Sequence, residues 1–168
     1  MTAVAIVQAR MNSSRLPGKV LLPLAGKPVL GHVIERLSYC RMIDRTVVAT
    51  SLEDTDDLIA DYCDENDIDL FRGSLNDVLD RYYQVATIYH ADPIVRITAD
   101  CPAIDPVVVD AVITGFLAGG YDLYGLGGEF PDGLDCTAIS FSAIEKAWKE
   151  AKSKSEREHV GPYIENNP

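Results

Sequence analysis

The sequence lacks any apolar run that approaches the roughly 18 residues needed for a membrane-spanning helix. It also lacks a positively charged segment before its first apolar stretch, which a secretion signal would carry. Hydrophobic residues nevertheless make up 47% of the 168 residues, a proportion typical of a globular domain. These absences predict a soluble protein that has no membrane partner and stays in the cytoplasm.

Cysteine and histidine are scarce and scattered. There are four cysteines and three histidines, and no two cysteines form a C-x-x-C pair. Zinc sites are usually built from such closely spaced ligands, so the sequence does not predict one. The cysteines are expected to be reduced residues with a structural role: Cys40, Cys63, Cys101 and Cys136.

Positive charge is also scarce, with 15 Lys and Arg residues against 26 Asp and Glu and a net charge of −11. This balance disfavours nucleic acid as a partner, because the phosphate backbone requires basic residues over a wide face. The N-terminal segment is the exception: no acid precedes Glu35, and three basic residues lie within Gln8–Lys19 (QARMNSSRLPGK). A cationic loop in an acidic protein predicts a binding site for a small anion.

This basic loop lacks the glycine patterns of two common phosphate-binding motifs. It contains neither G-x-x-x-x-G-K-[ST] nor G-x-G-x-x-G, which excludes a P-loop and a dinucleotide fingerprint. Arg10 and Arg15 can still bind a polyphosphate through forked guanidinium contacts, and Lys19 through its ammonium group. Backbone amides around Ser13 and Ser14 can add donors. The alternative is a solvated surface loop, but the loop's charge is opposite to that of the rest of the chain, which favours anion binding.

The hydrophobic pattern predicts a single α/β domain over residues 1–168. Short apolar runs rich in Val and Ile alternate with segments of helical periodicity, which is typical of a mostly parallel sheet in a three-layer αβα arrangement. Strands are expected at residues 3–7, 46–50, 68–71, 94–98, 121–124 and 137–140, and helices at 28–40, 54–66, 76–89, 106–120 and 142–151.

Capping residues predict where three of the helices begin. Asn76 is expected to cap the helix at 76–89, and Ser142 with Glu145 has capping-box spacing for the last helix. Pro106 is expected to begin a helix that ends at a Gly-Gly pair. The segment after residue 151 is polar, and no closing element is expected in it.

Residues that directly follow the strands are the candidates for ligand binding, because ligands of such sheets lie outside the carboxyl ends of the strands. The basic loop supplies cations, and Asp100 and Asp135 supply carboxylates from two other loops. Two hard oxygen ligands completed by substrate phosphates suit Mg²⁺. The sequence therefore predicts a metal-triphosphate site with Asp100 and Asp135 as candidate metal ligands. The alternative is that these carboxylates only cap a helix or stabilise turns, Asp100 before Pro102 and Asp135 next to the P-D-G turn at Asp132. The other polar candidates near strand ends are Gln8, Ser14, Ser51, Arg72 and Ser74.

Several segments taken together resemble a known family. They are ARMNSSRLPGKVL, VVATS, FRGS with DVLDRYY, RITADCPAIDP, FPDGLD and REHVGPYI, and they occur in this order along essentially the whole chain. The combination is similar to the spore coat polysaccharide biosynthesis protein F family. That family looks like a branch of the cytidylyltransferases that activate acidic sugars, namely the synthetases of CMP-3-deoxy-manno-octulosonate and of CMP-acylneuraminate. The basic loop is the most specific of these segments.

The resemblance implies a nucleotide-diphospho-sugar transferase fold, which is Rossmann-like, and a reaction of CTP with an acidic sugar that gives a CMP-sugar and pyrophosphate. It implies that Arg10, Ser14 and Lys19 hold the triphosphate and that Asp100 binds Mg²⁺, with Asp135 as a second ligand. Similar proteins continue beyond this length with further strands and a dimerisation segment, and a homodimer is an expected state. The positions implied to contact base and ribose are Ser51, Arg72 and Ser74.

Two other functions fit the same sheet. The first is a different enzyme, either a nucleotidyltransferase that uses a sugar 1-phosphate or a metal-dependent glycosyltransferase. The second is a relative that binds nucleotide without catalysis.

Overall fold

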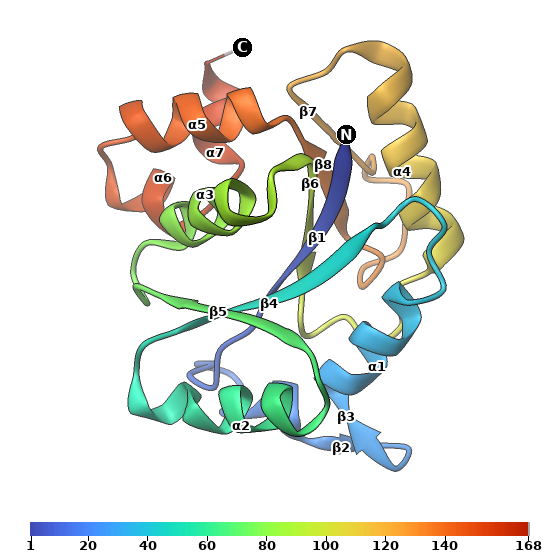
Figure 1. Ribbon diagram of the computed structural model, residues 1–168, viewed down its shortest axis with the longest axis vertical. Helices are drawn as coiled ribbons and strands as arrows, with labels where there is room; N and C mark the ends of the chain where they lie inside the picture. The colour runs from blue at the N-terminus through green and yellow to red at the C-terminus, as the bar shows by residue number, and fades with distance from the viewer. Residues whose placement is uncertain (168) are drawn as a thin grey trace.

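A six-stranded sheet forms the centre of the computed structural model, which describes residues 1–167 (Figure 1). The strand order is β5-β4-β1-β6-β8-β7; the first four strands are parallel, whereas β8 is antiparallel to both of its neighbours. The predicted mostly parallel α/β class is confirmed. The strands are β1 (Thr2–Gln8), β4 (Arg45–Ser51), β5 (Asp69–Gly73), β6 (Ala91–Thr98), β7 (Leu123–Gly125) and β8 (Cys136–Ile139).

Helices cover both faces of this sheet, which gives the expected three layers (Figure 1). One face packs against α1 (Val29–Leu37), α2 (Asp57–Glu65) and α4 (Pro106–Gly119). The other packs against α3 (Val78–Tyr89) and α5 (Phe141–Glu150), with the short helices α6 (Lys154–Glu158) and α7 (Pro162–Asn166) beside them.

The first strand shows why its sequence is a continuous apolar run. Val4 and Ile6 belong to the core beneath α3 and α5, whereas Ala5 and Val7 belong to the core beneath α1 and α4. Successive side chains of a strand point to opposite faces, so a strand covered on both faces is apolar at every position. Polar residues therefore occur in β1 only at its two ends, Thr2 and Gln8.

Two predicted helix starts are wrong by one or two residues. Asp77, not Asn76, caps α3, because its carboxylate accepts a hydrogen bond from the Asp80 amide at 2.9 Å. Ser140, not Ser142, caps α5, and its hydroxyl accepts from the Ala143 amide at 3.1 Å. In both places two capping residue types lie close together, and tertiary contacts decide which one supplies the acceptor.

The C-terminal segment contains two helices where none was expected. A Ser153/Glu156 capping box begins α6, and α7 buries Tyr163 and Ile164 against the core. Helices of five residues are too short to show a helical hydrophobic period, so sequence pattern misses them. The hairpin of β2 (Pro23–Leu24) and β3 (Lys27–Pro28) was also missed, because strands of two residues are too short to show an alternating pattern.

The cap of α4 allows a direct test of the fold. Asp105 accepts hydrogen bonds from the amides of Val107 at 2.8 Å and Val108 at 3.3 Å, and Pro106 begins the helix as predicted. Asp105→Ala is expected to lower the free energy of unfolding by about 1 kcal/mol, measured by urea denaturation. The matched control is Asp61→Ala on the exposed face of α2, and equal midpoints for the two variants would contradict the role of the cap.

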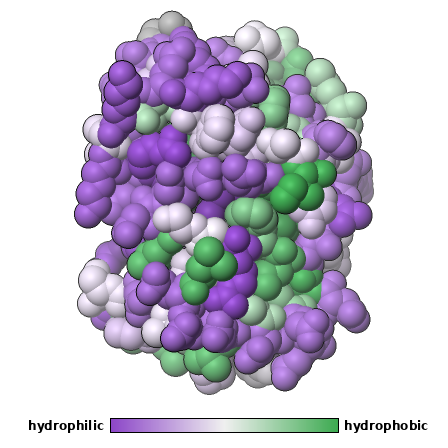
Figure 2. All heavy atoms as spheres, turned by 60° about the vertical axis from the view of Figure 1, so that its left-hand side comes forward, coloured by the Kyte–Doolittle hydropathy of each residue, from purple (hydrophilic) through white to green (hydrophobic). Residues whose placement is uncertain are grey.

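Among residues 1–167, no helix is both long and apolar enough to cross a membrane. Figure 2 shows a face that is mostly hydrophilic, with a band of hydrophobic side chains right of the centre and smaller hydrophobic groups elsewhere. The apolar side chains of the elements on this side are therefore largely turned inward, toward the two cores.

Candidate active site

The basic loop leaves the sheet at the carboxyl end of its central strand. Gln8, the last residue of β1, lies in register with Thr98, the last residue of β6. The parallel strands therefore place Gln8–Lys19 beside the loop that follows β6. The Lys19 ammonium donates a hydrogen bond to the Asp100 carboxylate and forms an ion pair with it, across 81 residues of sequence.

A pocket of about 210 Å³, here named the basic pocket, lies between these two loops. Arg10 and Arg15 are exposed at its wall and have no ion-pair partner among residues 1–167. Two free guanidinium groups next to an ammonium are suited to several phosphate oxygens. The lining comprises Gln8, Arg10, Ser13, Ser14, Arg15, Lys19, Val20, Thr98, Ala99 and Asp100. It brings together seven of the residues named from the sequence: Gln8, Arg10, Ser13, Ser14, Arg15, Lys19 and Asp100.

Hydrogen bonds near its start shape the basic loop. The Met11 carbonyl accepts from the Ser13 amide at 2.9 Å and from the Gly18 amide at 2.8 Å, which folds the loop back on itself. Gly18 has φ of 73°, a left-handed conformation that favours glycine. The Met11 amide in turn donates to the carboxylate of Asp56 at 2.7 Å.

Asp56 is a functional candidate that sequence reasoning missed. It is 1% exposed, and its carboxylate also accepts from the backbone amide and the hydroxyl of Ser51. One buried carboxylate thus connects the end of β4 to the start of the basic loop. The sequence offers no signal for this role, because Asp56 lies within an acidic stretch, EDTDD, that is otherwise typical of a solvated helix start.

The ionisation of Asp100 is set by opposing effects. Burial raises the pKa of its carboxyl. Hydrogen bonds from Lys19 and Thr98 and the charge of Lys19 lower the pKa by more than burial raises it, so the pKa lies below its ordinary value. Asp100 is therefore a carboxylate at neutral pH. A lone carboxylate beside a phosphate site fits Mg²⁺, which is often held by one or two carboxylates, substrate phosphates and waters.

Asp135 lies outside the basic pocket. It lines a neighbouring pocket of about 390 Å³, here named the β8 pocket, and accepts a hydrogen bond from the Gly133 amide at 3.3 Å. Within the described residues, no group of three or more His, Cys, Asp or Glu side chains lies together in a way that could hold a metal ion. Asp100 and Asp135 are thus not brought into one pocket, although Thr98 lines both.

The three residues expected to contact base and ribose have other partners. Ser51 is buried and bonded to Asp56, and Arg72 donates to the Ser51 carbonyl at 2.9 Å and pairs with Asp57 at 2.7 Å. Ser74 is exposed, and its carbonyl accepts from Arg81 at 2.5 Å. None of the three residues lines the basic pocket. Their hydrogen bonds and the Arg72 ion pair instead join the ends of β4 and β5 to the neighbouring loops.

A third pocket of about 240 Å³, here named the α6 pocket, adjoins the basic pocket. Gln8 and Arg10 line both, and the remaining wall comes from the loop after β5 and from the residues that end α6. Three hollows therefore lie side by side along the carboxyl edge of the sheet. The α6 pocket is lined by Gln8, Arg10, Leu75, Asn76, Val78, Glu158 and His159.

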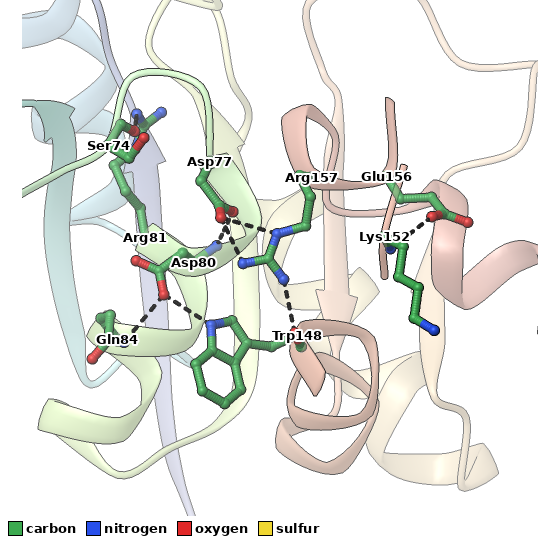
Figure 3. A network of polar contacts seen from close by, with 9 residues as sticks. All are labelled: Ser74, Asp77, Asp80, Arg81, Gln84, Trp148, Lys152, Glu156 and Arg157. Carbon is green, nitrogen blue, oxygen red and sulfur yellow. Dashed lines mark hydrogen bonds and ion pairs between the residues drawn. The ribbon is translucent and has the colours of Figure 1, made fainter. Parts of the chain in front are cut away.

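A polar network holds α6 against this pocket (Figure 3). Arg157 pairs with Asp77 at 2.5 Å and donates to the Trp148 carbonyl at 2.7 Å, while the Trp148 indole donates to Asp80 at 2.8 Å. The buried Arg81 holds the loop after β5 from the other side. The C-terminal segment, in which no closing element was expected, is therefore part of the site's wall.

A mostly parallel sheet with a pocket lined by cations at the carboxyl edge of its central strands is typical of nucleotide-binding α/β proteins. Comparison with known proteins makes this more specific. The family model described as cytidylyltransferase matches residues 4–168, and the chain therefore belongs to the cytidylyltransferase family.

Relatives of this chain agree with that assignment. The chain is 35% identical to the spore coat polysaccharide biosynthesis protein SpsF of Bacillus subtilis, over 97% of this chain and 70% of that protein. It is 38% identical to a 3-deoxy-manno-octulosonate cytidylyltransferase of Trichlorobacter lovleyi, over 70% of this chain and 46% of that protein. A solved cytidylyltransferase from Leptospira borgpetersenii superposes with a TM-score of 0.93 at 37% identity, covering 99% of this chain and 72% of that one. The family resemblance inferred from the sequence segments is confirmed.

Proposed function

We propose that this chain transfers CMP from CTP to an acidic sugar, giving a CMP-sugar and pyrophosphate for polysaccharide biosynthesis. The observation that carries the proposal is the basic pocket, where Lys19, Arg10 and Arg15 converge on one edge of a protein with a net charge of −11. Its cations suit a triphosphate. The adjoining α6 pocket, which shares Gln8 and Arg10 with it, suits the nucleoside.

In the proposed reaction a hydroxyl oxygen of the sugar attacks the α-phosphorus of CTP in line. The bond from the α-phosphorus to the bridging oxygen breaks, the proton of the sugar hydroxyl passes to water, and pyrophosphate leaves. Arg10, Arg15 and Lys19 neutralise the negative charge that develops on the departing group, which lowers the barrier because these donors are already in place. Asp100 would hold Mg²⁺, which when bound adds further neutralisation of phosphate charge.

The experiment is a substrate panel with pyrophosphate release as the readout. CTP, UTP, GTP and ATP are each combined with acidic sugars, including 3-deoxy-manno-octulosonate and N-acetylneuraminate, and with sugar 1-phosphates. Pyrophosphate is expected only from CTP with an acidic sugar, and its release is expected to stop when EDTA removes the divalent metal. Release with a sugar 1-phosphate instead would favour the other nucleotidyltransferase reaction. Tight CTP binding with no release at any Mg²⁺ level would favour a relative without catalysis.

A further inference from the structure

The β8 pocket lies on the far side of Thr98 from the α6 pocket, and the basic pocket lies between them. At about 390 Å³ it has room for a monosaccharide-sized ligand. It crosses the antiparallel end of the sheet and is closed on one side by α7. Its lining comprises Arg96, Thr98, Leu123, Gly125, Leu126, Asp135, Cys136, Thr137 and Glu165.

Arg96 is the one cation in this lining. It lies in the middle of β6, directly opposite Thr137 of β8 in the register, so the two side chains share a face of the sheet. Ile94, two residues earlier on that same face, is fully buried in the core beneath α3 and α5. An arginine in this row is unexpected, because strand positions that face a core are normally apolar.

Arg96 also lacks a counter-charge within residues 1–167. Its Nε is buried without a hydrogen-bond partner, and the side chain forms no ion pair with Asp135 or Glu165, although both carboxylates line the pocket. Burying part of a guanidinium without a partner costs free energy. The position is therefore stabilised when an anion enters the pocket.

The buried phenol of Tyr82 does not supply this charge. Tyr82 is fully buried, and burial raises the pKa of its hydroxyl to about 12 even though Arg96 and Arg81 oppose the shift. The neutral hydroxyl donates a hydrogen bond to the Ile6 carbonyl at 3.2 Å. Tyr82 is thus satisfied elsewhere and leaves Arg96 free.

We infer that the β8 pocket binds the acceptor sugar and that Arg96 forms an ion pair with the carboxylate of that sugar. This inference rests on the proposed CMP transfer. The exposed carboxylates of Asp135 and Glu165 and the hydroxyl of Thr137 can accept hydrogen bonds from sugar hydroxyls, so the lining suits a ligand with one acid group and several hydroxyls. Because Thr98 lines both pockets, an acceptor held here lies next to Asp100 and the phosphates of the donor.

The test is calorimetric titration of sugar acids into the CDP-saturated chain, in which no transfer occurs. The probes are 3-deoxy-manno-octulosonate, N-acetylneuraminate and glucuronate. At least one is expected to bind the original chain and to bind Arg96→Met at least about 10-fold more weakly, which corresponds to about 1.4 kcal/mol. The C1 amide of the same sugar lacks the carboxylate, and it is expected to bind the original chain and the Arg96→Met variant equally weakly. Arg96→Lys, which keeps the charge without the fork, is expected to recover part of the affinity.

Arg41→Met is the matched control, because Arg41 is exposed and lines neither the basic nor the β8 pocket. A CDP titration and a thermal melt on every variant report nucleotide binding and folding separately. If no sugar acid binds the CDP-saturated chain, or if Arg96→Met binds the acid as well as the original chain does, the role of Arg96 is overturned. If CDP itself does not bind, the proposed function fails instead, so the two failures are distinguished.

Discussion

Lys19→Ala is expected to reduce the rate of pyrophosphate release by roughly 10²–10³-fold, as the loss of one preorganised donor at a developing charge does in other enzymes. The Lys19 ammonium reaches the Asp100 carboxylate at the mouth of the basic pocket, so it lies where the phosphates are proposed to bind. The Lys19 side chain is 27% exposed and is not part of either hydrophobic core. The variant is therefore expected to have the same melting temperature as the original chain. Steady-state kinetics with CTP and a thermal melt measure the two effects.

The matched control for this prediction is Lys27→Ala. Lys27 belongs to the same cationic N-terminal segment, but it pairs with Glu35 at 2.7 Å and does not line the basic pocket. Removing Lys27 lowers the net charge by the same amount as removing Lys19. The rate of pyrophosphate release is expected to stay within about twofold of that of the original chain, because an exposed ion pair contributes little to stability. Equal rates for Lys19→Ala and the original chain would remove Lys19 from the reaction.

Asp56→Ala is expected to destabilise the fold by about 3 kcal/mol and to weaken CTP binding at the same time. The substitution leaves the half-buried amide of Met11 and the buried amide of Ser51 without their acceptor, and an unsatisfied buried group costs about 1–3 kcal/mol. Because the Met11 amide marks the start of the basic loop, the loop loses its attachment to β4. Urea denaturation measures the stability, and titration with CTP under native conditions measures the affinity.

Asp54→Ala separates these effects from a change of charge. Asp54 lies two residues earlier, in the same acidic turn, and is exposed, so its removal is expected to change stability by less than about 0.5 kcal/mol. If Asp56→Ala lowered stability but left the CTP affinity unchanged, Asp56 would support the fold without shaping the loop. If it changed neither, the hydrogen bonds to Met11 and Ser51 would not hold in solution.

The strand and helix pattern was predictable wherever the hydrophobic period was long enough to recognise. The helix over residues 106–120 was predicted with its first residue and its glycine end, because Pro106 and Gly120 have strong local preferences. The errors fall where two capping residues compete, as at Asn76 and Asp77, and where the elements are five residues long, as in α6 and α7. Local sequence does not distinguish these cases, since the contact that decides them comes from elsewhere in the chain.

By itself, the sequence determined that a cationic loop follows the first buried strand and that Asp100 follows another strand of the same sheet. Parallel strands end at a common edge, so Lys19 and Asp100 had to approach each other. Only the tertiary structure decided that Asp135 lines a separate pocket and that Asp56 anchors the loop across 45 residues. It also decided that Arg96, on a strand, has a buried Nε with no hydrogen-bond partner among residues 1–167. The physical reason is that pattern specifies which edge or face a residue occupies, whereas the partner of a polar side chain depends on loop paths and on the packing of distant helices.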